Sequence, residues 1–108
     1  MSDLSILNTL FETIEKRKKS DPEKSYTAKL FAKGRAKIAQ KVGEEATETV
    51  IEAMLGDKQK LAEESADLLY HLLVMWSDVG IAPADVAAVI EDRMHYTADE
   101  KKKRKGGD

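Results

Sequence analysis

Two pairs of acidic residues in the middle of the chain have a spacing that suits a metal site built on helices. Glu45 and Glu48 lie three positions apart, and Glu64 and Asp67 repeat this spacing further along. Residues three apart on an α-helix point to the same side, so each pair would present two carboxylates together. Glu44 adds a fifth acidic side chain beside the first pair. Carboxylate oxygens suit Mg²⁺, Mn²⁺ or Ca²⁺, so the spacing indicates a divalent-metal centre.

A predicted helical hairpin would bring the two acidic pairs together. Gly56 and Asp57 separate two long helical patterns, and Asp57 has the right side chain to cap the second helix. Glu48 lies eight residues before Gly56 and Glu64 lies seven after Asp57, so antiparallel helices would place both at the same height. Carboxylates forced together repel one another and lose solvation, and a cation removes that penalty. Glu45 falls at the edge of the apolar side of its helix, and we expect it to be half buried.

Lysines recur every four residues just before the first acidic pair. They are Lys29, Lys33, Lys37 and Lys41, with Arg35 among them. On one continuous helix they would form a stripe leading to the acidic centre, where they could neutralise a polyphosphate bound beside a metal ion. The sequence has no glycine-rich P-loop. The alternative interpretation is a solvated helix face, just as either acidic pair alone is an ordinary surface pattern.

The elements that must position these residues are predicted to be helices. Apolar residues recur at helical spacing over about 3–18, 27–33, 35–55, 58–79 and 83–94. Ser2 or Asp3 is expected to cap the first helix, and Gly34 to end the second or kink the chain. No segment favours a strand. The expected fold class is therefore all-α, a small bundle of about five helices.

The chain has 108 residues, which is one domain with a thin core. We expect an all-α domain over 1–97 and a basic, disordered tail over 98–108, with nucleic-acid contact by the tail as a remote alternative. The predicted helix 58–79 is apolar on most of its circumference, which favours a homodimer in which Trp76 is a core or dimer contact.

Several other classes of protein are excluded or disfavoured by composition. The chain has no cysteine, so a disulfide framework or a zinc–thiolate site cannot form. The N-terminus lacks the basic and apolar regions of a signal peptide, and no apolar run approaches the roughly 18 residues of a membrane span. We therefore expect a cytoplasmic protein without a membrane partner.

The sequence around the acidic residues resembles that of a known enzyme superfamily. The stretch 44–48, followed after 15 residues by 64–67, resembles the signature of the MazG-like all-α nucleoside triphosphate pyrophosphohydrolases. Within this superfamily, four segments are similar to the phosphoribosyl-ATP pyrophosphohydrolases of histidine biosynthesis: SYTAKL at 25–30, KGR at 33–35, IAQKVGEE at 38–45 and ESADLLYHL at 64–72. The likeness covers roughly residues 4–93, and the lysine-rich tail departs from the family pattern.

This resemblance implies a reaction, a cofactor and an assembly. The reaction is hydrolysis of 1-(5-phosphoribosyl)-ATP between its α and β phosphates, which gives phosphoribosyl-AMP and pyrophosphate and is the second step of L-histidine biosynthesis. The implied cofactor is Mg²⁺, with Mn²⁺ as an alternative, and the implied assembly is a homodimer. Carried over to this sequence, the metal ligands would be Glu45, Glu48, Glu64 and Asp67, with Glu44 as an added candidate.

The resemblance also implies roles in catalysis and substrate binding. Either Glu45 or Glu48 would orient or deprotonate the attacking water. The expected phosphate-binding residues are Lys29, Lys33, Arg35 and Lys41. Tyr26 would stack on the base or on the extra ribose, or else pack at the start of its helix.

Two other functions remain open at this point. One is a housekeeping pyrophosphohydrolase acting on (deoxy)nucleoside triphosphates, with the same metal site and a different pocket. The other is a helical interaction module without activity, whose acidic residues are a solvated face. His71, one turn after Asp67, is expected to be a hydrogen-bonded core histidine rather than a partner of the Asp67 carboxylate.

Overall fold

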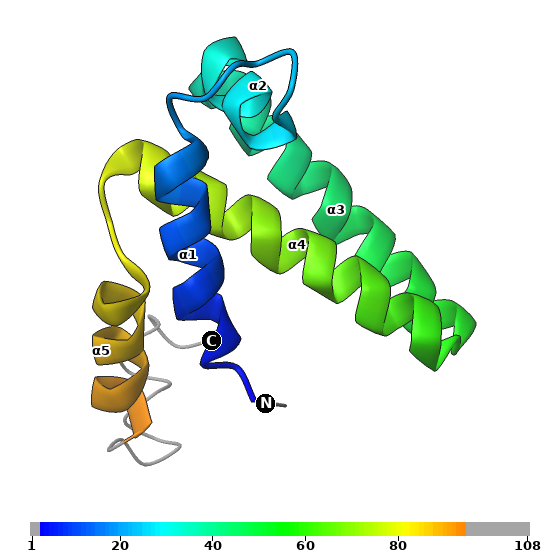
Figure 1. The fold of residues 1–108 in the computed structure, drawn as a ribbon. Coiled ribbons are helices and arrows are strands. Elements are labelled where there is room, and N and C mark those ends of the chain that lie inside the picture. The colour runs from blue at the N-terminus through cyan, green and yellow to red at the C-terminus, as the bar shows by residue number, and fades with distance from the viewer. Residues whose placement is uncertain (1–2, 95–108) are drawn as a thin grey trace.

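The computed structural model describes residues 3–94, and this part of the chain is built from five α-helices (Figure 1). They are α1 (Ile6–Arg17), α2 (Tyr26–Lys33), α3 (Arg35–Leu55), α4 (Lys58–Val79) and α5 (Pro83–Met94). Residues 3–94 contain no strand, which confirms the all-α fold class. The predicted domain end at 97 and the predicted basic tail over 98–108 lie outside the described residues.

The two long helices, α3 and α4, run side by side as an antiparallel hairpin (Figure 1). Gly56 ends α3 with a φ of 78°, in the left-handed region that glycine adopts readily, and its N–H donates to the carbonyls of Glu52 and Ala53. The Asp57 carboxylate then caps α4 by accepting a hydrogen bond of 3.0 Å from the Lys60 N–H. The hairpin and its cap are as the sequence predicts.

The helical chain breaks between α2 and α3 at Gly34. This residue has φ 95° and ψ 173°, a conformation essentially restricted to glycine, and its N–H donates to the carbonyls of Leu30 and Phe31. The predicted lysine stripe on one continuous helix is therefore wrong. Lys29 and Lys33 belong to α2, whereas Lys37 and Lys41 belong to α3.

The N-terminal ends of the first two helices also differ from the prediction. Helix α1 begins at Ile6 rather than near Asp3. The Asp3 carboxylate does not cap the helix, because it accepts hydrogen bonds from the backbone N–H and the hydroxyl of Ser5 in a local turn. Helix α2 begins at Tyr26, and Ser25 caps it by accepting a 3.1 Å hydrogen bond from the Ala28 N–H.

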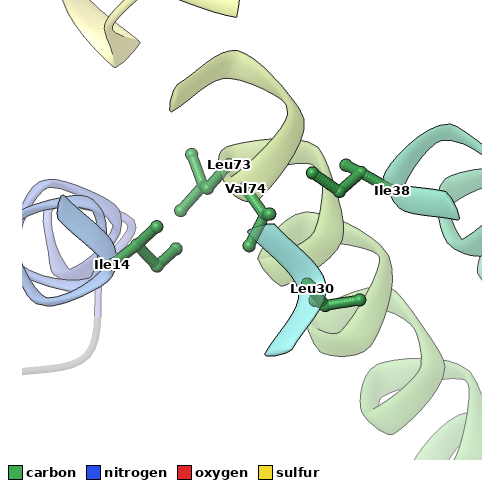
Figure 2. Packing of buried hydrophobic residues seen from close by; sticks show 5 residues of the cluster. All are labelled: Ile14, Leu30, Ile38, Leu73 and Val74. Atoms are coloured by element: carbon green, nitrogen blue, oxygen red, sulfur yellow. The ribbon is translucent and has the colours of Figure 1, made fainter. Parts of the chain in front are cut away.

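The buried core lies where α1 and α2 cover the hairpin. In Figure 2, Leu73 and Val74 from α4 lie between Ile14 on α1 and Ile38 on α3, with Leu30 from α2 beside them. The far end of the hairpin extends beyond the other three helices (Figure 1). There, four apolar side chains of α3 are exposed: Val50, Ile51, Met54 and Leu55.

No single helix among residues 3–94 is both long and apolar enough to cross a membrane. Helices α4 and α5 meet the length and composition requirements only when taken together, and the chain bends by 107° between them.

Candidate metal centre

Three carboxylates meet between α3 and α4. Glu45, Glu48 and Glu64 each bring one side-chain oxygen into a group whose members lie within 4.8 Å of one another. The matched distances of Glu48 and Glu64 from the hairpin turn produce this meeting. Oxygens bound to one Mg²⁺ at about 2.1 Å can be up to about 4.2 Å apart, so the group needs only a small contraction to hold an ion. We call Glu45, Glu48 and Glu64 the acidic triangle.

Glu64 carries the clearest sign that the acidic triangle suits a cation. Its Oε2 atom is buried and has no hydrogen-bond partner among the described residues. Loss of solvation, together with the neighbouring Glu48 and Glu45, raises the pKa of Glu64 to about 7. Buried polar atoms are normally satisfied, and a divalent cation would satisfy this one and offset the repulsion. The donor set therefore fits a hard cation such as Mg²⁺ or Mn²⁺.

Glu45 is the most enclosed member of the triangle. It is only 8% exposed, which is more buried than the half-buried position expected from the helical pattern. Lys41 lies one turn earlier on α3, with its Nζ 3.8 Å from the Glu45 Oε2 atom. This ion pair partly balances the negative charge on the enclosed side of the site.

The other two predicted ligands lie outside the triangle. Glu44 is exposed and accepts hydrogen bonds from Gln40 at 2.7 Å and from Lys41 at 3.1 Å, and these hold its pKa below the usual value. Asp67 is also exposed, one turn after Glu64 on α4. The structure therefore groups three of the five predicted ligands, and a ligand role for Asp67 or Glu44 stays a prediction.

An open groove adjoins the triangle on the outer side of α3. It has a volume of about 530 Å³, and its lining comes from Gln40, Gly43, Glu44, Thr47 and Glu48. Glu48 belongs to both the groove and the triangle, so a ligand in the groove would lie against the acidic centre.

The predicted phosphate-binding cations fall into separate places. Lys41 lies at the triangle, whereas Lys29 and Lys33 are exposed on α2. Arg35 lies ten residues before Glu45, which corresponds to about 15 Å along α3. Its Nε donates to the Asp78 carboxylate at 2.7 Å, so it joins the start of α3 to the end of α4.

A cluster of aromatic and polar side chains fastens α2 to α4 near this site, and the sequence did not reveal it. The Tyr26 hydroxyl lies 3.1 Å from the His71 Nε2 atom, and His71 Nδ1 lies 2.8 Å from the carbonyl oxygen of Asp67. The hydroxyls of Thr27 and Tyr70 form a second hydrogen bond beside it. His71 is thus the buried, hydrogen-bonded histidine that was expected, and its partner on Asp67 is the backbone rather than the carboxylate. The pairing of Tyr26 with His71 spans 45 residues and has no local sequence signal.

Comparison with known proteins adds an independent finding. The sequence profile of a family described as phosphoribosyl-ATP pyrophosphohydrolase matches residues 7–94. A phosphoribosyl-ATP pyrophosphatase of Azospirillum brasilense is 65% identical over 82 residues, which cover 76% of this chain and 74% of the relative. Proteins with the same name from Paramagnetospirillum magneticum and Cereibacter sphaeroides are 56% and 54% identical, over 94% and 83% of this chain and 94% and 87% of their own lengths.

Proposed function

The chain belongs to the phosphoribosyl-ATP pyrophosphohydrolase family, and from this premise we propose that it hydrolyses phosphoribosyl-ATP at the acidic triangle between α3 and α4. Water adds across the bond between the α and β phosphates, and the products are phosphoribosyl-AMP and pyrophosphate. This is the second step of L-histidine biosynthesis. The observation that carries the assignment to this site is the buried, unpartnered Glu64 oxygen beside Glu45 and Glu48.

The residues that would hold Mg²⁺, or Mn²⁺ in its place, are Glu45, Glu48 and Glu64. Asp67 would join them from the next turn of α4, and Glu44 would do so only by giving up its hydrogen bonds to Gln40 and Lys41. The ion supplies positive charge to the phosphate oxygens when it is bound. The unpartnered Glu64 oxygen supports this choice of ligands, because a carboxylate that carries charge there needs a cation.

Glu48 is the better of the two candidates for activating water. Glu45 is buried and paired with Lys41, so its carboxylate is already engaged. Glu48 is exposed and lines the groove, where water and substrate can both reach it. In the proposed step, the Glu48 carboxylate takes a proton from water while the water oxygen bonds to one of the two phosphorus atoms that flank the α–β bridging oxygen. The bond from that phosphorus to the bridging oxygen breaks, and the group that keeps the bridging oxygen leaves, as pyrophosphate or as phosphoribosyl-AMP.

Cations of α2 and α3 would neutralise the polyphosphate. Lys41 is closest to the triangle and would meet the reacting phosphates. Lys29 and Lys33 belong to α2, and we propose that they contact phosphates further from the reacting bond. Arg35 is the weakest candidate in this set, because its guanidinium is engaged by Asp78.

A second copy of the chain is the proposed partner. Val50, Ile51, Met54 and Leu55 leave between 48% and 82% of their surfaces exposed at the far end of the hairpin. Exposed apolar side chains gathered in this way usually mark an interface. A chain this small also buries more apolar surface when it pairs with a second copy. The cytoplasmic location expected from the sequence stays a prediction.

A product assay tests the function directly. Purified protein with Mg²⁺ would be given phosphoribosyl-ATP, dUTP or dCTP in parallel, and the products resolved by mass spectrometry. The expected result is phosphoribosyl-AMP and pyrophosphate from the first substrate, with the activity lost on chelation. Hydrolysis of the deoxynucleotides alone would move the chain to the housekeeping activity. No hydrolysis by a folded, metal-loaded sample would overturn the proposal.

A further inference from the structure

The hydrogen-bond partners of His71 fix how its ring is protonated. Its Nδ1 atom lies 2.8 Å from the Asp67 carbonyl oxygen, which can only accept a hydrogen bond. In the neutral ring, Nδ1 therefore carries the proton and Nε2 carries none. Nε2 can then only accept, so the Tyr26 hydroxyl, 3.1 Å away, must donate its proton to His71.

This arrangement commits the Tyr26 hydroxyl proton to the interior of the protein. The ring of Tyr26 is held in place as well, at 6.0 Å from the His71 ring in an edge arrangement and at 6.2 Å from the Tyr70 ring in a stacked one. Tyr26 nevertheless remains 52% exposed. With its proton donated to His71, the phenolic oxygen keeps lone pairs that can accept a further hydrogen bond and has no proton to donate.

The Tyr26 oxygen also lies close to the proposed active site. His71, which accepts the hydrogen bond from the Tyr26 hydroxyl, is held at its Nδ1 atom by the carbonyl oxygen of Asp67, 2.8 Å away. Asp67 lies one turn after Glu64 of the acidic triangle on α4. Tyr26 is therefore linked through His71 to the turn of α4 that adjoins the triangle.

We infer that His71 is a positioning residue that makes Tyr26 a hydrogen-bond acceptor for the nucleoside part of the substrate. This inference rests on the proposed function. Phosphate oxygens only accept hydrogen bonds, so a Tyr26 oxygen whose proton points to His71 has nothing to offer them. Ribose hydroxyls and the adenine amino group are donors, and they are the groups that this oxygen suits. Tyr26 thus recognises the part of the substrate that is not pyrophosphate.

The two reaction products serve as probes, because phosphoribosyl-AMP carries the nucleoside part of the substrate and pyrophosphate carries none of it. In Tyr26→Phe, the inhibition constant of phosphoribosyl-AMP should rise about five- to tenfold, the usual effect of one lost hydrogen bond. The inhibition constant of pyrophosphate with Mg²⁺ should stay unchanged, as should kcat, while KM for phosphoribosyl-ATP rises. Equal weakening of both products, or no change in either, would overturn the inference.

Variants of His71 test whether it acts through Tyr26. His71→Leu should reproduce the KM rise of Tyr26→Phe, and the double variant should be no worse than either single one. His71→Gln should retain most of the wild-type KM, because its amide oxygen can accept from the Tyr26 hydroxyl. Additive losses would contradict a positioning role. If His71→Leu fails to fold, the inhibition constants of the two products in Tyr26→Phe still test the acceptor role of Tyr26.

A substrate analogue identifies which group of the nucleoside donates a hydrogen bond to the Tyr26 oxygen. Phosphoribosyl-AMP whose adenosine lacks the 2′ and 3′ hydroxyls should be insensitive to Tyr26→Phe if those hydroxyls are the donors. Equal sensitivity of the analogue and the parent compound assigns the donor to the amino group or the second ribose.

Wild-type turnover is measured before the variants are compared. Its absence would overturn the proposed function, whereas normal turnover with unchanged inhibition constants in Tyr26→Phe would overturn this inference alone.

Discussion

Glu48 on α3 and Glu64 on α4 face each other across the hairpin, and one carboxylate oxygen of each lies within 4.8 Å of the other. After loss of solvation, Glu48 is the largest cause of the raised pKa of Glu64, which lies near 7. The proximity of these two carboxylates predicts that the protein responds to pH and to Mg²⁺, and the next two experiments test this.

Without metal, the protein should lose stability as pH rises towards neutrality. The pKa of Glu64 is raised from 4.5 to about 7, so between these values the folded state binds a proton that the unfolded state has released. The stabilisation is complete below pH about 4.5 and is lost as pH passes about 7. Melting temperatures measured in chelator from pH 5 to 8 should fall more in the wild type than in Glu64→Gln, and Mg²⁺ should reverse the fall. Parallel curves for the two proteins would contradict this assignment.

Glu48→Gln should abolish turnover while leaving the fold intact. The amide keeps the size of the side chain and removes both the negative charge and the basic oxygen, so kcat should fall by at least about 100-fold. Titration with Mg²⁺ should also show weaker binding. Glu63→Gln is the matched control, because Glu63 is exposed on α4 and hydrogen-bonded to Gln59 outside the triangle. Comparable activity in the two variants would remove Glu48 from the site.

Replacing Gly34 should cost stability through the backbone alone. A Cβ at this position would meet no atom within 4 Å, but φ 95° is strained for any other residue. Gly34→Ala should therefore lower the free energy of unfolding by about 1–3 kcal/mol in denaturant titrations. Gly43→Ala serves as the opposite control, because Gly43 lies within α3 with the same open space around it. That change should raise stability by about 0.5–1 kcal/mol.

Met54→Glu should weaken the proposed dimer with little effect on the fold of one chain. Met54 is 82% exposed at the far end of the hairpin, so a charge there should hardly change the stability of a single chain. Burying the same charge in an apolar interface would strongly weaken association. Light scattering should show a shift towards the mass of one chain, and Gln59→Glu, at an exposed polar position near the same end, should not. Trp76→Glu should give monomer or aggregate, because Trp76 also packs against the core. A dimer unchanged in Met54→Glu would place the interface elsewhere.

Arg35 and Asp78 should behave as a structural pair. Arg35→Ala and Asp78→Ala should each reduce stability by about 1 kcal/mol or less, because the Arg35 partner of this ion pair is largely exposed to solvent. Their effects on KM should be small and equal. A marked rise in KM for Arg35→Ala alone would instead support the phosphate-binding role that the sequence suggested.

The parts of the fold that could be predicted are those marked by local chemistry. Both ends of α3 and α4 and the start of α5 coincide with residues that cap or break helices through their own backbone or side chain: Gly34, Gly56, Asp57, Gly80 and Pro83. The matched distances of Glu48 and Glu64 from the turn are likewise visible in the sequence. The depth of Glu45 was underestimated, because the cover provided by neighbouring helices cannot be read from α3 alone.

The parts that could not be predicted depend on how α2 lies against the hairpin. The sequence allowed Gly34 either to end a helix or to bend one, and only its φ and ψ in the folded chain decide between them. The same placement determines that Tyr26 meets His71 and that Thr27 meets Tyr70. Because these contacts join residues more than 40 apart, no periodic pattern within one helix could reveal them.

The acidic triangle is local in sequence, and this has a consequence for how the protein folds. Its members all come from one hairpin, in which Glu45 and Glu64 are 19 positions apart, so closing a single short loop brings them together. The buried core, by contrast, needs Ile14 of α1 to reach Leu73 of α4, a separation of 59 residues. Contacts close in sequence form sooner than distant ones during folding. The carboxylates can therefore come together before the N-terminal helix has docked. At that stage their repulsion must already be offset, by a bound proton or a cation.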